Sequence, residues 1–187
     1  MDSLIMSIRG FKTKDIKGAS ALKGITNGAD GDAAVAVNSV EFEISRNVTL
    51  DVGNGNNSDT GELTGGILVV TKPVDGLTPA INTILFKPKK GRCIDFTYGT
   101  PTTDGTGLNV QQVITIDGAK VIDYKVSTSG NDANGKVPVE QITISYTAIV
   151  SKFQPSKIDG TFGDVTADMV SYDFSKGVLE AGTKIGK

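Results

Sequence analysis

The sequence predicts a mainly β protein, either a β-sandwich or a partly closed barrel, with one short helix. Three observations support this fold class. Apolar and polar residues alternate in several segments, which is the period of a half-buried strand. The 187 residues include 23 glycines and no tryptophan, which favours many turns between short strands. Only one segment has the apolar spacing of a helix, and the length fits a single domain over 1–187.

The first third of the chain is expected to hold two strands and a long connection. Residues 3–9 form the first strand, and residues 12–37, rich in Gly, Ala and Lys with weak periodicity, form the connection. Residues 39–52 alternate over a long stretch, which predicts one half-buried strand. The face expected to point to the core carries Val40, Phe42, Ile44, Val48, Leu50 and Val52.

A long polar segment, residues 51–65, separates that strand from the next predicted strand at 65–73. A tight hairpin needs two to five residues, and this run of Gly, Asn, Ser, Asp and Thr is far longer. Its composition fits a phosphate cradle, a calcium loop, disorder, or an arm that reaches another chain. The phosphate-loop spacings G-x-x-x-x-G-K-[ST] and G-x-G-x-x-G are both missing.

Two acidic turns at 27–32 and 129–135 resemble calcium loops only in composition. Neither has the D-x-[DN]-x-[DN]-G series that a bidentate Glu closes. Asp and Asn favour tight turns through local hydrogen bonds, which explains both segments. We therefore expect no cofactor and no metal ion.

The predicted helix spans 77–91. Thr78 is suited to cap its N-terminus, and Pro79 suits the first helical position. Pro88 and Gly91 end it, so it has two to three turns. Its apolar stripe consists of Leu77, Ile81, Ile84 and Leu85.

The second half of the chain returns to strands. Residues 93–99 form one, and residues 109–128 read as two strands turning at Asp117–Gly118, with a β-bulge as the alternative. Residues 139–154 and 167–175 alternate and form the last two predicted strands. Residues 177–187 are expected to be a tail.

The composition excludes several kinds of active site. With no His and one Cys, the chain cannot form a Ser–His–Asp triad, a Cys–His pair or a His- or Cys-rich zinc site. Glu41 and Glu43 lie about 6–7 Å apart on one strand face, which suits an inverting glycosidase, but exposed alternation explains them equally well. Cys93 is expected to be a small core residue. We predict that the protein is not an enzyme.

The charge and hydropathy of the chain argue against nucleic-acid and membrane partners. A net charge of −2 gives no nucleic-acid footprint, and the densest basic cluster, KPKKGR at 87–92, is typical of a solvated turn. No apolar run reaches membrane-spanning length. The start, MDSLIMSIRGF, lacks the basic region and apolar run of a signal peptide. We expect neither membrane insertion nor export by the general secretory route.

Several strings occur in an order typical of one known family: MSIRG, then GGILVVTKPVDGLTPAINTILFKPKKG, then VIDYKVSTSG, then VPVEQITISYTAIVSKFQPSKIDG. Over residues 38–176 and parts of 3–10, the chain resembles the hemolysin-coregulated protein (Hcp) family, the inner-tube subunit of type VI secretion systems. The resemblance implies a compact antiparallel β-barrel of two packed sheets with one flanking α-helix and a long extended loop.

The resemblance also implies a function. Hexameric rings would stack into a hollow tube that is exported and carries effectors, with spike protein, contractile sheath and effectors as partners. The subunit would be cytoplasmic before assembly and then secreted without a signal peptide. A phage-type tail tube protein and a secreted ligand-binding β-sandwich are the alternatives.

Two sets of residues are expected to serve assembly. In the family the loop between the second and third strands reaches the neighbouring ring, and here its residues are Asp51, Gly53, Asn54, Gly55, Asn56, Asn57, Ser58, Asp59, Thr60, Gly61 and Glu62. The helix is expected beside a subunit boundary, through Pro79, Asn82, Thr83 and Phe86.

Overall fold

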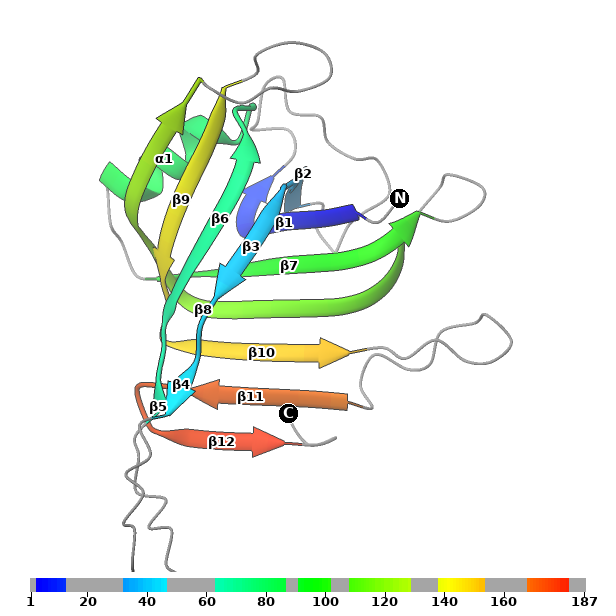
Figure 1. The fold of residues 1–187 in the computed structure, drawn as a ribbon, viewed down its shortest axis with the longest axis vertical. Coiled ribbons are helices and arrows are strands. Elements are labelled where there is room, and N and C mark those ends of the chain that lie inside the picture. Colours follow the sequence, from blue (N-terminus) through cyan, green and yellow to red (C-terminus); the bar gives the residue numbers. More distant parts are fainter. Residues whose placement is uncertain are drawn as a thin grey trace, which may run out of the picture.

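The computed structural model describes residues 3–12, 32–46, 63–86, 91–101, 108–128, 138–153 and 168–181. Within these ranges the fold is mainly β, with antiparallel strands and one helix (Figure 1). The predicted fold class is confirmed. The elements are β1 (Ser3–Lys12), β2 (Asp32–Ala36), β3 (Ser39–Phe42), β4 (Ser45–Arg46), β5 (Leu63–Thr64), β6 (Ile67–Pro73), α1 (Thr78–Phe86), β7 (Arg92–Pro101), β8 (Leu108–Ser127), β9 (Val139–Ser145), β10 (Ala148–Phe153), β11 (Asp168–Asp173) and β12 (Val178–Ala181).

Two sheets share the strand β8. The seven-stranded sheet has the order β12-β11-β10-β8-β7-β1-β2, and the four-stranded sheet has the order β3-β6-β9-β8. The short strands β4 and β5 pair separately as a ribbon. In Figure 1 the strands of the four-stranded sheet cross in front of those of the seven-stranded sheet. The core therefore lies between two crossing layers.

The segment 109–128 is one long strand with a corner, so the two-strand hairpin is wrong and the alternative, a β-bulge at Asp117–Gly118, is confirmed by the register shift against β7. The strand pairs with β10 as far as Asp117 and with β7 as far as Ala119, and from Lys120 onward it pairs with β9. Gly118 lies at the corner with φ +67°, a conformation that glycine adopts without a Cβ penalty. A single strand can thus serve both layers because glycine permits the bend.

The segment 139–154 is also different from the prediction, because it is two strands. β9 pairs with β6 in the four-stranded sheet, whereas β10 pairs with β8 and β11 in the other sheet. The chain changes sheets at Tyr146 and Thr147, whose backbone N–H groups donate to Gly66 O (2.8 Å) and Asp117 O (2.9 Å). Sequence alternation continues through this corner, so periodicity alone gave no sign of it.

Three further boundaries differ from the predictions. The expected connection 12–37 contains β2, which pairs with β1, and the expected tail 177–187 contains β12, which pairs with β11. The expected strand 39–52 ends as β3 at Phe42, and a break at residues 43–44 precedes β4. Phe42 and Ile44, predicted to face the core, are about two-fifths exposed.

The two layers are tied together on the side away from β8. Val37 N–H donates to Leu4 O on β1 (2.9 Å), and Asn38 N–H donates to Thr71 O on β6 (2.7 Å). Among the described residues no ladder runs continuously around the structure, so the expected barrel is two packed sheets joined at a shared strand and at this junction.

One hydrophobic cluster fills the space between the layers. Both sheets and the inner side of α1 contribute to it, which confirms the core-facing roles of Leu77 and Ile81. Its buried members are Met6, Ile8, Val35, Val37, Leu68, Val70, Leu77, Ile81, Ile94, Phe96, Ile116, Ala119, Val121, Ile142, Ile144, Tyr146 and Ile149.

Candidate assembly surface

The ribbon β4–β5 continues β3 and β6 beyond the end of the four-stranded sheet, at the opposite end from α1 (Figure 1). It is built from two residue pairs, Ser45 with Thr64 and Arg46 with Leu63. The hydroxyls of Ser45 and Thr64 are 2.9 Å apart and hydrogen-bonded. The ribbon therefore carries Arg46, where β4 ends, and Leu63, where β5 begins, away from the core.

Two glycines fix the base of this ribbon. Gly66 has φ +94°, and a Cβ there would approach Tyr146 O to 2.9 Å. Gly65 packs so closely on Phe174 that a Cβ would lie 2.7 Å from its ring. Phe174 is itself held by an edge-on contact with Tyr172, with ring centroids 4.8 Å apart. The direction in which the ribbon leaves the body is thus set by close packing.

The residues predicted to bridge rings lie between β4 and β5 in sequence and outside the described residues. Their assignment as an inter-ring loop therefore stays a prediction. These residues are Asp51, Gly53, Asn54, Gly55, Asn56, Asn57, Ser58, Asp59, Thr60, Gly61 and Glu62.

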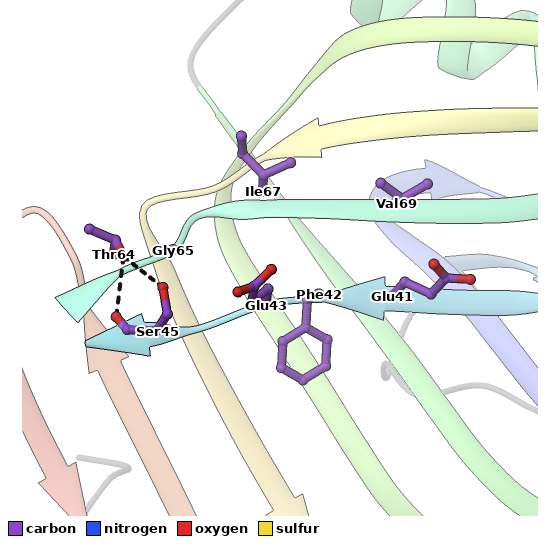
Figure 2. A pocket seen from close by; sticks show the side chains of 8 residues that line it. All are labelled: Glu41, Phe42, Glu43, Ser45, Thr64, Gly65, Ile67 and Val69. Carbon is purple, nitrogen blue, oxygen red and sulfur yellow. Dashed lines mark hydrogen bonds between the residues drawn. The ribbon is translucent and has the colours of Figure 1, made fainter. Parts of the chain in front are cut away.

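A groove of about 600 Å³ opens beside the ribbon base, on the face of the four-stranded sheet that points away from the core. Figure 2 shows its lining residues: Glu41, Phe42, Glu43, Ser45, Thr64, Gly65, Ile67 and Val69. Apolar side chains of β6 lie beside two carboxylates of the β3 strand and its continuation. The groove is therefore acidic and partly apolar.

The four-stranded sheet has two open edges. Within the described ranges β3 pairs only with β6, and the stretch of β8 from Lys120 to Val126 pairs only with β9. Large apolar side chains lie exposed at both edges. Phe42 (41%) and Ile44 (40%) lie at the β3 edge, and Ile122 and Val126 (both 51%) lie on β8. Unpaired strand edges with exposed apolar residues are templates for pairing with another chain.

A buried polar network fixes the start of α1. The Nζ of Lys72 lies 2.6 Å from Glu140 Oε1 and 2.7 Å from Asp75 Oδ1. Glu140 also accepts hydrogen bonds from the hydroxyls of Thr78 (2.9 Å to Oε2) and Tyr124 (2.8 Å). Charged groups without solvent contact are tolerated when their hydrogen-bonding capacity is met in this way.

This network corrects the predicted helix cap. Ile81 N–H donates to Leu77 O (3.1 Å), so Thr78 is the first helical residue and Pro79 the second. The Thr78 hydroxyl binds Glu140 instead of capping the helix, and Asp75 Oδ1 accepts from Leu77 N–H (2.8 Å). The buried carboxylate of Glu140 needs hydrogen-bond donors, and the Thr78 hydroxyl serves as one of them instead of capping the helix.

The network also affects a phenol. Burial, followed by the hydrogen bond to Glu140, raises the pKa of Tyr124 to about 12. Asn82, predicted to lie at a subunit boundary, is half-buried beside Tyr124, and its Oδ1 has no hydrogen-bond partner among the described residues. That contact is with the chain's own body.

The other three helix residues predicted for the boundary face solvent. Pro79 and Thr83 are exposed, and Thr83 donates its hydroxyl to Pro79 O (2.8 Å). Among the described residues Phe86 is the most exposed large apolar side chain, at 77%. Their role in subunit contact stays a prediction, because exposure does not identify a partner.

The described residues offer little for catalysis. Cys93 is half-buried outside the core cluster, so the expected core position is wrong. Burial raises the pKa of its thiol to about 11, which keeps it protonated near neutral pH. Among the described residues there is no group of three potential metal ligands. Within the same ranges no helix has the length and apolar character needed to cross a membrane.

Sequence reasoning missed two features of this surface. Lys72 and Glu140 were not paired, although KPVDGLTP places a lysine, an aspartate and a threonine just before the helix. The open edge of β8 was missed because the predicted hairpin at Asp117–Gly118 would have paired the two halves of this segment with each other. Only the pairing of strands in space identifies an edge.

Comparison with solved structures places the fold among type VI secretion proteins. A structure described as a type six secretion system protein has a TM-score of 0.73 with 14% identity, covering 96% of this chain and 100% of that one. Hcp1 from Salmonella typhimurium gives 0.61 with 14% identity, covering 96% and 99%. Hcp3 from Pseudomonas aeruginosa gives 0.53 with 17% identity, covering 92% and 98%. At these identities the likeness concerns the fold.

The family assignment comes from the sequence. A family model described as type VI secretion system effector, Hcp, matches residues 7–153. The chain therefore belongs to the Hcp family of type VI secretion proteins, as the resemblance in the sequence predicted. This family is structural and secreted and is not a family of enzymes. A comparison with curated protein sequences gives no match.

Proposed function

We propose that this chain is a non-catalytic structural subunit of a type VI secretion tube. Six copies form a ring, rings stack into a hollow tube, and the tube is exported with effectors. The observation that carries the proposal is the four-stranded sheet with two open edges, each bearing exposed apolar side chains. Membership in the Hcp family supports it.

Two different edges on one subunit favour a ring. A contact between unlike surfaces of identical chains is heterologous, and repeated rotation closes it when the angle divides a full turn. Contact between the two ends of a ring does not close, so it produces a filament. The same subunit thus supports a closed ring and an open stack through separate surfaces.

The ribbon gives the proposed stacking contact its direction. β4 and β5 project beyond the end of the body opposite α1 (Figure 1). The chain between them is polar in sequence, which suits an arm that is exposed in a free ring. In a stack, this end of one ring faces the α1 end of the next. We assign the contact to residues 51–62.

The proposed partners follow from this role. They are further copies of the chain, the spike protein, the contractile sheath and effectors. The subunit resides in the cytoplasm before assembly and leaves through the secretion system. It has no nucleic-acid partner.

Mass and images of the purified protein test the proposal. We expect a particle near six times 19.5 kDa and doughnut-shaped rings in negative stain. Deleting residues 53–61 should leave the monomer folded and rings intact, and it should reduce stacking at high concentration. A protein that stays monomeric at high concentration would overturn the ring, and unchanged tubes in the deletion variant would overturn the loop assignment.

A further inference from the structure

We propose that Phe174 is a positioning residue for stacking: its ring packs on Gly65 and fixes the direction of the β4–β5 ribbon from the C-terminal hairpin β11–β12. This inference rests on the proposed stacking of rings. It adds which residue directs the ribbon, and it gives a role to the strand β12, which was expected to be part of a tail.

Strand pairing alone does not hold the ribbon in its direction. The ribbon contains two residue pairs, and residues 43–44 and 65–66 separate them from the ladder of β3 and β6. Figure 2 shows Gly65 at this interruption, between the ribbon and β6. A two-stranded hairpin in water is marginally stable by itself. Packing against another part of the body is therefore needed to fix the ribbon.

The ring of Phe174 supplies this packing on one side. A Cβ at Gly65 would lie 2.7 Å from Cε1 and 2.8 Å from Cζ of the ring, closer than Cβ atoms pack. The ring therefore occupies the space that a side chain at position 65 would take. In Figure 1 the ribbon lies beside the turn between β11 and β12, which agrees with this contact. The ring thus limits how far the ribbon can move towards that turn.

A hydrogen bond holds the ribbon base through the next residue. Tyr146 N–H donates to Gly66 O at 2.8 Å, and a Cβ on Gly66 would lie only 2.9 Å from Tyr146 O. An approach of two backbones this close, at φ +94°, suits glycine alone. Gly66 is thus tethered to the corner between β9 and β10 while Gly65 rests on the ring. Two successive residues of the base are fixed in this way.

The ring is itself held by contacts with the body. It packs edge-on against Tyr172, with centroids 4.8 Å apart, and against Tyr146, with centroids 5.7 Å apart. Edge-to-face pairs at these distances are favourable. Phe174 N–H donates to Thr147 O (2.9 Å), and Thr147 N–H donates to Asp117 O (2.9 Å), at the corner of β8. The support of the ribbon is therefore continuous with the corner that joins the two sheets.

The turn between β11 and β12 keeps Phe174 in place. Asp173 accepts hydrogen bonds from Ser175 N–H (2.9 Å) and from Lys176 Nζ (2.8 Å). Gly177 closes the turn at φ +64°, and β12 then pairs with β11. The C-terminal hairpin thus carries the ring that directs the ribbon.

A directed ribbon should strengthen stacking and leave ring formation unaffected. A segment whose direction is already fixed loses less conformational entropy when it binds a neighbour. The open edges to which we assign the ring belong to β3 and β8, whereas Phe174 follows β11 in the other sheet. Changing the contact between Phe174 and Gly65 should therefore alter stacking alone.

A size exchange across this contact tests the inference. F174L leaves a gap where the ring ended, and G65A places a methyl group where the ring lies. Each variant should form rings as the wild type does, and each should need about tenfold more protein for stacking. In G65A/F174L the methyl group fills the gap, so stacking should return to near the wild-type concentration. Sedimentation velocity and negative-stain images measure rings and stacks.

A control variant and the wild type separate the possible failures. F153L makes the same substitution at an exposed phenylalanine of β10 and should leave rings and stacks unchanged. Wild-type rings that do not stack would end the proposed stacking contact and this inference together. If the wild type stacks, normal stacking in both single variants, or no recovery in G65A/F174L, would overturn the role of Phe174 alone.

Proteolysis provides a readout that does not require stacking. Arg46 ends β4, and no lysine or arginine follows it before Lys72, so trypsin cuts residues 46–71 only after Arg46. On unstacked rings, this cleavage should be about fivefold faster in each single variant than in the wild type, because it requires local opening of the ribbon. In G65A/F174L it should return to the wild-type rate.

Cleavage after Arg9, whose side chain binds Asp95 from within β1, is the internal control of the same digest. It should proceed at the same rate in all four proteins. Unchanged cleavage after Arg46, or equal acceleration at Arg46 and Arg9, would overturn the local role of Phe174, because the second result indicates a general loss of stability.

Discussion

Lys72 and Glu140 are completely buried, yet each side chain has several hydrogen-bonding partners. Together with Asp75 and Thr78 they hold the start of α1 against the strands β6 and β9. Such a pair costs free energy to desolvate, so its main effect is to fix a position and not to add stability.

Glu140→Ala should therefore lower the free energy of unfolding by about 3–5 kcal/mol, because Lys72 is left charged and buried without its main partner. Urea denaturation of the monomer measures this loss. Asp123→Ala, which removes an exposed ion pair with Lys125, should cost under about 1 kcal/mol. Similar losses in both variants would contradict the buried network.

Gly118 allows a single strand to serve two sheets. Its φ is +67°, and a Cβ would overlap the Thr147 hydroxyl. Gly118→Ala should destabilise the protein by about 2–4 kcal/mol, from backbone strain together with overpacking. Gly177→Ala, at φ +64° with no atom closer than 4.0 Å, should cost only about 1–2 kcal/mol. Thermal unfolding measures the loss of stability in both variants, and the difference between the two losses is the cost of the steric overlap at Gly118.

Tyr124 gives stability a dependence on alkaline pH. Its pKa rises to about 12 in the folded state, above the usual value of 10.0. Its contribution is therefore complete below pH 10 and is lost as the pH rises from 10 towards 12. Between pH 9 and 11, the urea midpoint of the wild type should fall more steeply than that of Tyr124→Phe. Parallel curves would argue against the raised pKa.

At the scale of elements, the two sides of α1 have different roles. Ile81 belongs to the core cluster, whereas Phe86 at the end of the helix is largely exposed. Ile81→Ala should cost about 2–5 kcal/mol in monomer stability. Phe86→Ala should cost under about 1 kcal/mol and should instead weaken assembly if the helix lies at a subunit boundary. Urea denaturation of the monomer and analytical ultracentrifugation of the assembly distinguish the two effects.

The strands show where local pattern was sufficient. β1, β6, β7 and β11 were predicted because alternation or an apolar run marks a strand wherever one face is buried. β2 and β12 were missed because each is short and lies at a sheet edge. Each is a strand because it pairs with one neighbour, and neither has a clear alternation of apolar and polar residues. The corners at Gly118 and Tyr146 were misread because a strand that changes sheets keeps its alternation.

At the scale of the whole molecule, assembly should couple to stability. A ring removes the open edges of the four-stranded sheet from water, and binding that favours the folded state raises the melting temperature by mass action. The melting temperature of the wild type should therefore rise with protein concentration. Scanning fluorimetry over a hundredfold range of concentration measures this rise. A wild-type melting temperature independent of concentration would contradict obligate assembly.

The sequence by itself determined the fold class, the one helix and its buried stripe, the family, and the exclusion of His-based catalysis. These follow from composition, from short-range periodicity and from the order of a few strings, all of which are local properties. The tertiary structure alone decided that Lys72 and Glu140 meet 68 positions apart, that β8 bends between two sheets, and that, among the described residues, both edges of the four-stranded sheet are unpaired. Strand pairing joins residues distant in the chain, and local pattern carries no record of which edges remain unpaired.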